Sequence, residues 1–277
     1  MISDFWTYLS NSEHWTGKQG LRANLFDHLT YTFVAVGIAI LIAVPLGLWI
    51  GHTGKGSTLV VGSVNASRAL PTFGLMVLLY IWIAPQFTGK TNLPYILPVE
   101  FVLLLLAIPP LLSNSYAGVQ SVEPAMRDAA QGMGMTDWQV LTRVELPNAL
   151  PLMMSGLRAA TLQVVATATI GAYIGLGGLG APIYDATQQG PFQDTPDSHV
   201  ATGELLCGAV LVALLALGLD LVLATIQRYS TSRGITGRYR KSHIPGPANA
   251  AVEVSEPDGG DHRPTRNAVV PREVPAG

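Results

Sequence analysis

Uncharged, mostly apolar runs recur along the first 230 residues of the chain, and short charged segments separate them. A helix needs about 20 consecutive apolar residues to cross the hydrocarbon core of a bilayer. A short helix near 57–67 is too polar to be counted. The pattern predicts an all-α polytopic bundle of about five transmembrane helices, near residues 29–51, 62–85, 96–118, 149–174 and 204–227.

The 277-residue chain has few charges, and they are unevenly placed. Only 12% of its residues are Asp, Glu, Lys or Arg, whereas a typical soluble domain has about 25%. Residues 29–227 hold 16 of the 34 charged residues, which argues strongly against a soluble enzyme, because its surface needs more charge. The net charge of −2 argues against a nucleic-acid partner. The single cysteine, Cys207, excludes an intrachain disulfide and a cysteine metal cluster.

The Lys and Arg residues between the predicted spans give the orientation. With five spans, 12 of the 16 Lys and Arg residues fall on one side and three on the other. The positive-inside rule places the richer side in the cytoplasm, so the N-terminus is expected outside the cell membrane and the C-terminus inside. The expected regions are an N-terminal extracytoplasmic or interfacial segment (1–28), a transmembrane domain (29–227) and a basic, disordered cytoplasmic tail (228–277).

The segment 118–147 is too long for a simple connection between two spans, which takes about four to six residues. Pro124 suits a first helical turn, and an apolar stripe at helical spacing follows it, formed by Met126, Ala129, Ala130 and Met133. Gly134 is expected to end this helix, which covers about 123–135. Thr136 and Gln139 fit a capping box that starts a second helix, and Pro147 is expected to stop it.

The same segment resembles the "EAA" motif of ATP-binding-cassette (ABC) importer permeases. That motif reads Glu-Ala-Ala, three residues, Gly, nine residues, then Ile-x-Leu-Pro. Here Asp128-Ala129-Ala130, Gly134 and Val144-Glu145-Leu146-Pro147 keep the spacing, with Asp128 in place of Glu and Val144 in place of Ile. The resemblance extends over residues 21–230. The sequence Arg68-Ala69-Leu70-Pro71-Thr72 is similar to another segment of the family, and Gly175-Leu176-Gly177-Gly178-Leu179-Gly180 resembles the osmoprotectant subfamily, which imports glycine betaine, choline, carnitine or proline.

The resemblance implies a MetI-like ABC permease fold in the plasma or inner membrane. It implies a transport subunit rather than an enzyme, with no cofactor or metal of its own, because a partner ATPase binds the ATP. The expected partners are ABC ATPase subunits, a second permease copy or homologous permease, an extracytoplasmic substrate-binding protein and the lipid membrane. The residues expected to couple the chain to the ATPase lie in the loop 123–147: Arg127, Asp128, Ala129, Ala130, Gly134, Leu146 and Pro147.

Two sets of residues within the spans are further candidates. Asp220 is expected to pair with Arg68 or Arg158 inside the bundle or to reach the Arg228 interface, since charges within a membrane need partners. A quaternary ammonium group binds to aromatic faces, so Tyr80, Trp82 and Tyr173 are speculative residues of the substrate pathway. Tyr95 and Tyr116 lie nearby in the sequence.

Two alternatives remain open at this point. The chain fits an ABC permease for another small solute, such as methionine or another amino acid, because the spans do not specify a substrate. It also fits a non-transporting membrane scaffold or sensor. The scaffold predicts that Gly134→Asp leaves ATPase association intact, whereas the transporter predicts loss of assembly or coupling.

Overall fold

A computed structural model describes residues 2–17, 19–87, 91–190 and 198–230 of the chain. The tail predicted from 228 to 277 lies outside the described residues from 231 onward. All regular elements in the described ranges are helices. In chain order they are α1 (Ile2–Ser10), η1 (Ser12–Trp15), α2 (Leu21–Thr53), α3 (Ser57–Ala69), α4 (Thr72–Ile83), η2 (Ala84–Gln86), α5 (Leu93–Gln120), α6 (Pro124–Gly132), α7 (Asp137–Val140), η3 (Leu141–Glu145), α8 (Leu146–Ala168), η4 (Thr169–Ile174), α9 (Gly180–Gln188) and α10 (Ser198–Ser230).

Four helical stretches are long and apolar enough to cross a membrane: α2, α5, the continuous stretch Asp137–Ile174 that contains α8, and α10. Helix α2 has 33 residues and is therefore about 50 Å long at 1.5 Å per residue. That length exceeds the roughly 30 Å of a bilayer's hydrocarbon core. The all-α membrane bundle predicted from the sequence is confirmed.

The second predicted span, 62–85, is wrong as a single helix. The chain forms α3 and α4 instead, two helices of 13 and 12 residues. Leu70 between them has extended dihedral angles, φ −75° and ψ 122°, because a residue before proline is disfavoured in the helical region. Pro71 then precedes the first turn of α4. The described residues therefore hold four candidate spans rather than five, and residues 57–67 are helical after all.

Helix α5 is at the centre of the bundle and packs against both α2 and α8. Small residues allow these helices to approach closely. A Cβ atom added at Gly47 or Gly51 of α2 would lie 2.7 Å from the Cβ of Ser115 or Val119 of α5. At Gly118 of α5 it would lie 2.9 Å from the Cβ of Ala149. Close contact between small residues is a common way to hold helices together in lipid, where burying apolar surface gains little.

Helix α10 packs on α8, α9 and α1, and a bidentate ion pair joins it to α8. Arg158 donates from Nε to Asp220 Oδ1 at 2.8 Å and from Nη2 to Asp220 Oδ2 at 2.9 Å. The pairing expected for Asp220 is thus made with Arg158. Cys207 on the same helix is fully buried, as a small core residue should be.

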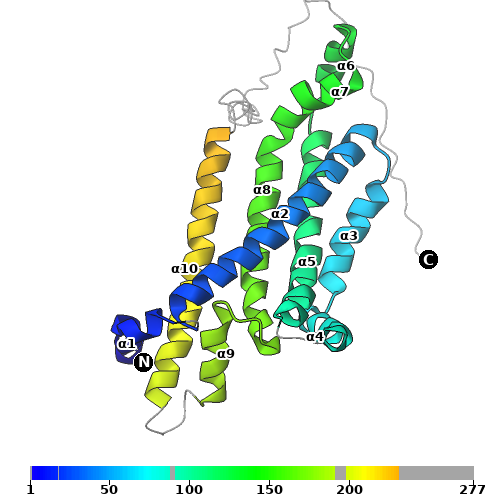
Figure 1. Cartoon of the computed structure of the whole chain (residues 1–277). Helices are drawn as coiled ribbons and strands as arrows, with labels where there is room; N and C mark the ends of the chain where they lie inside the picture. The colour runs from blue at the N-terminus through cyan, green and yellow to red at the C-terminus, as the bar shows by residue number, and fades with distance from the viewer. Residues whose placement is uncertain (1, 18, 88–90, 191–197, 231–277) are drawn as a thin grey trace, which may run out of the picture. The chain divides into compact units, whose positions relative to one another are not determined.

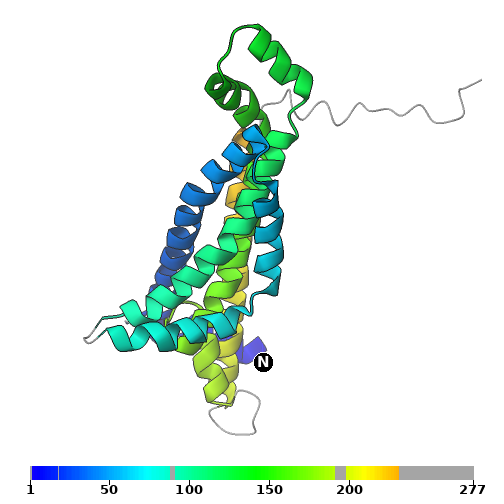
Figure 2. The same cartoon turned by 90° about the vertical axis from the view of Figure 1, so that its right-hand side faces the viewer.

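Short helices lie at the two ends of the bundle, and α3 runs beside it along α5 (Figures 1 and 2). Helices α6 and α7 lie at one end, which we call the loop end. Helices α4 and α9 and the glycine segment 175–180 lie at the other, which we call the glycine end. The residues that the sequence singled out for ATPase coupling are therefore far from the aromatic residues singled out for the substrate.

Candidate coupling site

Helix α6 begins and ends where its sequence predicts. Pro124 occupies the first turn, and the helix ends at Gly132. Gly134 follows with φ +83°, a left-handed conformation that residues with a Cβ atom rarely adopt. Its N–H donates to the Gln131 carbonyl at 2.9 Å, and the Met135 N–H donates to the Ala130 carbonyl at 3.2 Å. These bonds satisfy carbonyl groups at the end of the helix, so Gly134 fixes the turn after α6.

The second helix of the loop also begins as predicted, with the capping box of Thr136 and Gln139 in place. The Thr136 N–H donates to Gln139 Oε1 at 2.9 Å.

The prediction that Pro147 stops this helix is wrong. A π turn, Leu141–Glu145, connects α7 to α8, and the chain continues as one helical stretch. Proline has no N–H, and its ring collides with the carbonyl four residues earlier in a regular α-helix. Here the π turn ends two residues before Pro147, which lies in the first turn of α8, where proline is tolerated. The Val144 carbonyl accepts from Asn148 Nδ2 at 2.6 Å.

The predicted coupling residues divide into an exposed group and an inward group. Asp128, Ala129, Gly134 and Pro147 are exposed, whereas Ala130 is buried and Leu146 is half-buried. Met133 and Trp138 are also exposed, at 73% and 71%. Large apolar side chains exposed on a short polar helix suit a contact with another protein. The exposed surface of α6 and its turn, which we call the α6 face, is formed by Ala125, Asp128, Ala129, Gln131 and Met133.

Arg127 points into the chain rather than into the α6 face. Its Nη2 donates to the Val119 carbonyl of α5 at 2.6 Å, and its Nε lies 2.8 Å from Glu145 Oε1. The second contact is held by charge and proximity rather than by an aligned hydrogen bond. Its predicted contact with the ATPase stays a prediction.

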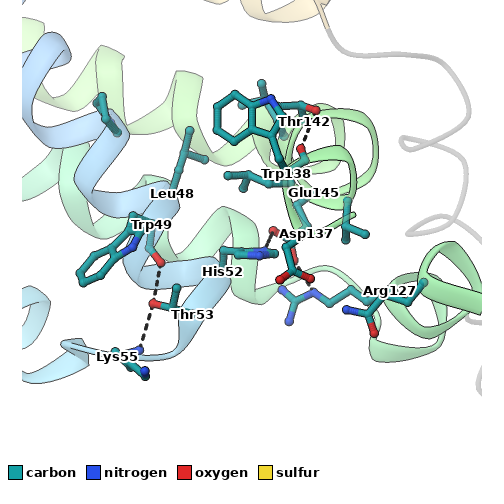
Figure 3. A pocket seen from close by; sticks show the side chains of 15 residues that line it. Leu48, Trp49, His52, Thr53, Lys55, Arg127, Asp137, Trp138, Thr142 and Glu145 are labelled. Atoms are coloured by element: carbon teal, nitrogen blue, oxygen red, sulfur yellow. Dashed lines mark hydrogen bonds and ion pairs between the residues drawn. The ribbon is translucent and has the colours of Figure 1, made fainter. Parts of the chain in front are cut away.

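Glu145 is the residue at this site that sequence reasoning missed. Its side chain is fully buried, and its Oε2 lies 2.7 Å from His52 Nδ1 at the end of α2. Buried carboxylates need partners, because losing water costs several kcal/mol per charge. Figure 3 shows His52 reaching toward Glu145 from α2 and Arg127 from α6. The only signal in the sequence was an acidic residue between Val144 and Leu146, directly before a predicted span.

A cavity of about 840 Å³ lies beside these three side chains. Trp49 and Lys55, from the end of α2 and just beyond it, line one side, and Asp137 and Trp138 of α7 line another (Figure 3). The first turn of α7 is therefore separated from the end of α2 by open space. The contact of His52 with Glu145 bridges the two parts of the chain beside that space.

The glycine end has a different construction. Gly175, Gly177 and Gly178 all have left-handed φ angles, between +74° and +90°. The buried His28 of α2 holds this segment: the Leu179 N–H donates to its Nδ1 at 3.3 Å, and its Nε2 lies 3.1 Å from the Val165 carbonyl. Nε2 must donate to a carbonyl, so this geometry assigns the proton to Nε2.

The aromatic residues predicted for the substrate pathway do not form one group. Tyr80 stacks on Tyr95 with ring centroids 5.5 Å apart. Tyr173 makes edge contacts with Tyr184, at 5.0 Å, and with Phe73, at 6.0 Å. The third candidate, Trp82, is 70% exposed.

The sequence of this chain is similar to a known family of membrane proteins. Residues 43–233 match the family described as "Binding-protein-dependent transport system inner membrane component". The glycine betaine/carnitine/choline transport system permease protein OpuCB of Bacillus subtilis is 33% identical over 211 residues, 76% of this chain and 88% of that protein. The osmoprotectant import permease protein OsmW of Salmonella typhimurium is 33% identical over 220 residues, 78% of this chain and 94% of that protein.

Solved structures agree on the fold. An inward-facing structure of the MetNI methionine ABC transporter contains a chain with a TM-score of 0.61 and 22% identity, covering 76% of this chain and 96% of that one. A chain in the crystal structure of an amino acid ABC transporter with histidines has a TM-score of 0.60 and 18% identity, covering 83% of this chain and all of that one. At these identities the likeness concerns the fold of the chain.

Proposed function

The chain belongs to the binding-protein-dependent transport system inner membrane component family, and from that premise we propose that it is the permease subunit of an osmoprotectant importer. Its substrates are glycine betaine, choline, carnitine or proline. A separate ABC ATPase supplies the energy, an extracytoplasmic binding protein delivers the solute, and a second permease copy or a homologue completes the pathway. The loop end faces the cytoplasm.

The α6 face is the observation that carries this function. It presents Asp128, two small side chains (Ala125 and Ala129) and the exposed Met133 on a short helix. The turn at Gly134 fixes one end of that helix. A narrow apolar and acidic helix face of this kind fits a groove on another protein. The ATPase docks there, and closure of two ATPases moves two such helices.

The choice of substrate rests on the relatives named above and on aromatic surface at the glycine end. A quaternary ammonium group is attracted to the faces of aromatic rings. The stacked pair Tyr80 and Tyr95, and Tyr173 with its two edge neighbours, offer such faces. We assign Tyr80 and Tyr173 to the pathway. Trp82, exposed on α4, belongs to the same proposal as a residue at its rim.

Uptake of labelled solutes tests this proposal. The permease is reconstituted in proteoliposomes with its ATPase and binding protein, and uptake of glycine betaine, choline, carnitine and proline is measured with and without ATP. We expect ATP-dependent uptake of at least one of them. If the ATPase hydrolyses ATP in the assembled complex and none of the four solutes enters, the osmoprotectant assignment is wrong.

A charge reversal tests the docking surface. Asp128→Arg places a cation on the α6 face, and we expect the ATPase to lose its association with the permease in co-purification. Asp185→Arg is the matched control, because Asp185 is also exposed but lies on α9 at the glycine end. Equal association of the ATPase with both variants would contradict docking at α6.

A further inference from the structure

Glu145 lies where side chains from α2 and α6 meet, and its partner Arg127 also contacts α5. Its two carboxylate oxygens face partners from different helices, His52 of α2 and Arg127 of α6. Arg127 in turn donates to the Val119 carbonyl of α5. The Glu145 side chain is only 1% exposed, so water does not solvate its carboxylate. The contacts with these partners are therefore expected to persist, because an unpaired buried charge is strongly unfavourable.

The backbone around Glu145 is suited to a change of position. Glu145 ends the π turn Leu141–Glu145, which separates α7 from the regular helix α8. Single π turns within α-helices are frequent at functional sites. The cavity of about 840 Å³ beside the turn leaves room for the loop to move against α2. The contact between His52 and Glu145 therefore joins a part of the chain that has room to move to the end of a long helix.

Helix α2 extends from this contact to the glycine end. It is continuous from Leu21 to Thr53, so His52 and His28 are separated by 24 residues, about 36 Å along the axis. Gly47 and Gly51 seat α2 tightly on α5. At the other end, His28 contacts the Val165 carbonyl and the Leu179 N–H. One helix thus contacts the coupling loop through one histidine and the glycine segment through another.

We propose that Glu145 and His52 are positioning residues that pass a displacement of α6 to α2 and so to the glycine segment. The proposal rests on the proposed function, because it assumes that an ATPase displaces α6. It requires that the ATPase still binds when the contact is broken and that the glycine end then no longer responds to ATP.

The test measures that response directly, in the complex of permease and ATPase. Cys207 is replaced by Ala, and Tyr173→Cys places a half-exposed thiol beside the glycine segment. Its reaction rate with a charged thiol reagent is measured without nucleotide and with ATP plus vanadate. We expect the rate to change at least about fivefold in the otherwise unaltered chain, within the range of coupling between linked sites.

Two variants break the contact from opposite sides. His52→Leu removes the partner on α2, where the side chain is 20% exposed, and leaves Arg127 beside Glu145. Glu145→Gln removes the negative charge between the two partners. We expect both to retain the ATPase and its hydrolysis of ATP but to lose the change in thiol reactivity, whereas Glu145→Asp restores part of it. Thr53→Val, next to His52 and exposed, is the matched control and keeps the full response.

A full response in His52→Leu would overturn the proposal. If Glu145→Gln does not assemble, His52→Leu alone decides the question, because His52→Leu leaves Arg127 beside the buried carboxylate. The thiol measurement does not require a transported solute. If the response to ATP is normal but the permease that keeps Tyr173 takes up none of the four solutes, the substrate assignment fails and the coupling proposal stands.

Discussion

The packing of α2 on α5 allows a sharp test at two glycines of the same helix. A Cβ atom at Gly47 would lie 2.7 Å from the Cβ of Ser115 and 2.8 Å from the Leu112 carbonyl oxygen. Both neighbours are fixed to the backbone of α5, so neither is able to turn aside. A Cβ atom at Gly37 meets nothing within 4 Å. Gly47→Ala and Gly37→Ala therefore make the same chemical change in one crowded and one open position.

The expected sizes follow from the distances. Carbon atoms attract each other best at about 3.5–4.0 Å, so the helices must separate by about 1 Å to admit the methyl group at Gly47. Overpacking of this kind costs about 1–3 kcal/mol. Alanine also stabilises a helix relative to glycine by up to about 1 kcal/mol. Gly47→Ala should then lower the free energy of unfolding by up to about 2 kcal/mol, while Gly37→Ala leaves it equal or higher.

Thermal unfolding of the purified permease measures the difference. A change of 1 kcal/mol shifts the Tm of a protein of about 200 residues by about 2–4 °C. We expect the Tm of Gly47→Ala to be several degrees lower than that of Gly37→Ala. Equal Tm values for the two variants would refute the close packing of α2 on α5 at this position.

Three further predictions concern the loop and the ion pair. Gly134→Ala forces a side chain into φ +83°, which should cost about 1–2 kcal/mol and reduce ATP-driven uptake. Gly132→Ala, which meets nothing within 4 Å, should leave uptake unchanged. Thr136→Val removes the capping hydroxyl of α7 and should cost about 0.5–2 kcal/mol, seen as a lower Tm with unchanged helix content. Asp220→Asn weakens the two hydrogen bonds from Arg158 and should lower the Tm. Unchanged protein level and uptake would contradict a role for this pair.

The local features of the coupling loop were predictable because their signals lie within a few residues of one another. Pro124, Gly134 and the capping box of Thr136 and Gln139 act on the turn that contains them. The break at Pro71 also has a local signal, the proline itself. The apolar run around it, however, has the same pattern whether one helix or two helices cover it. The helix through Pro147 was not predictable in this way, because it depends on a π turn that the spacing of apolar residues does not reveal.

The contacts that join distant parts of the chain were the least predictable. His52 and Glu145 are 93 residues apart in sequence, and nothing near either of them indicates the other. The same holds for His28 and Leu179, which are 151 residues apart. Arg158 and Asp220 were a foreseeable pair only because lone charges within apolar spans need partners. Family resemblance directed attention to the loop 123–147, whereas only the three-dimensional arrangement showed the contacts of Glu145 with His52 and Arg127.

The π turn before α8 affects how α7 is rotated about the axis of α8. A π turn contains one residue more than an α turn, and one residue corresponds to about 100° of rotation about a helix axis. The wider turn takes up that extra residue, so α7 keeps nearly the phase that it would have on one regular helix with α8 that is one residue shorter. The direction in which the α6–α7 hairpin points is therefore nearly independent of that residue, whereas an inserted residue that stayed α-helical would turn the hairpin by about 100°.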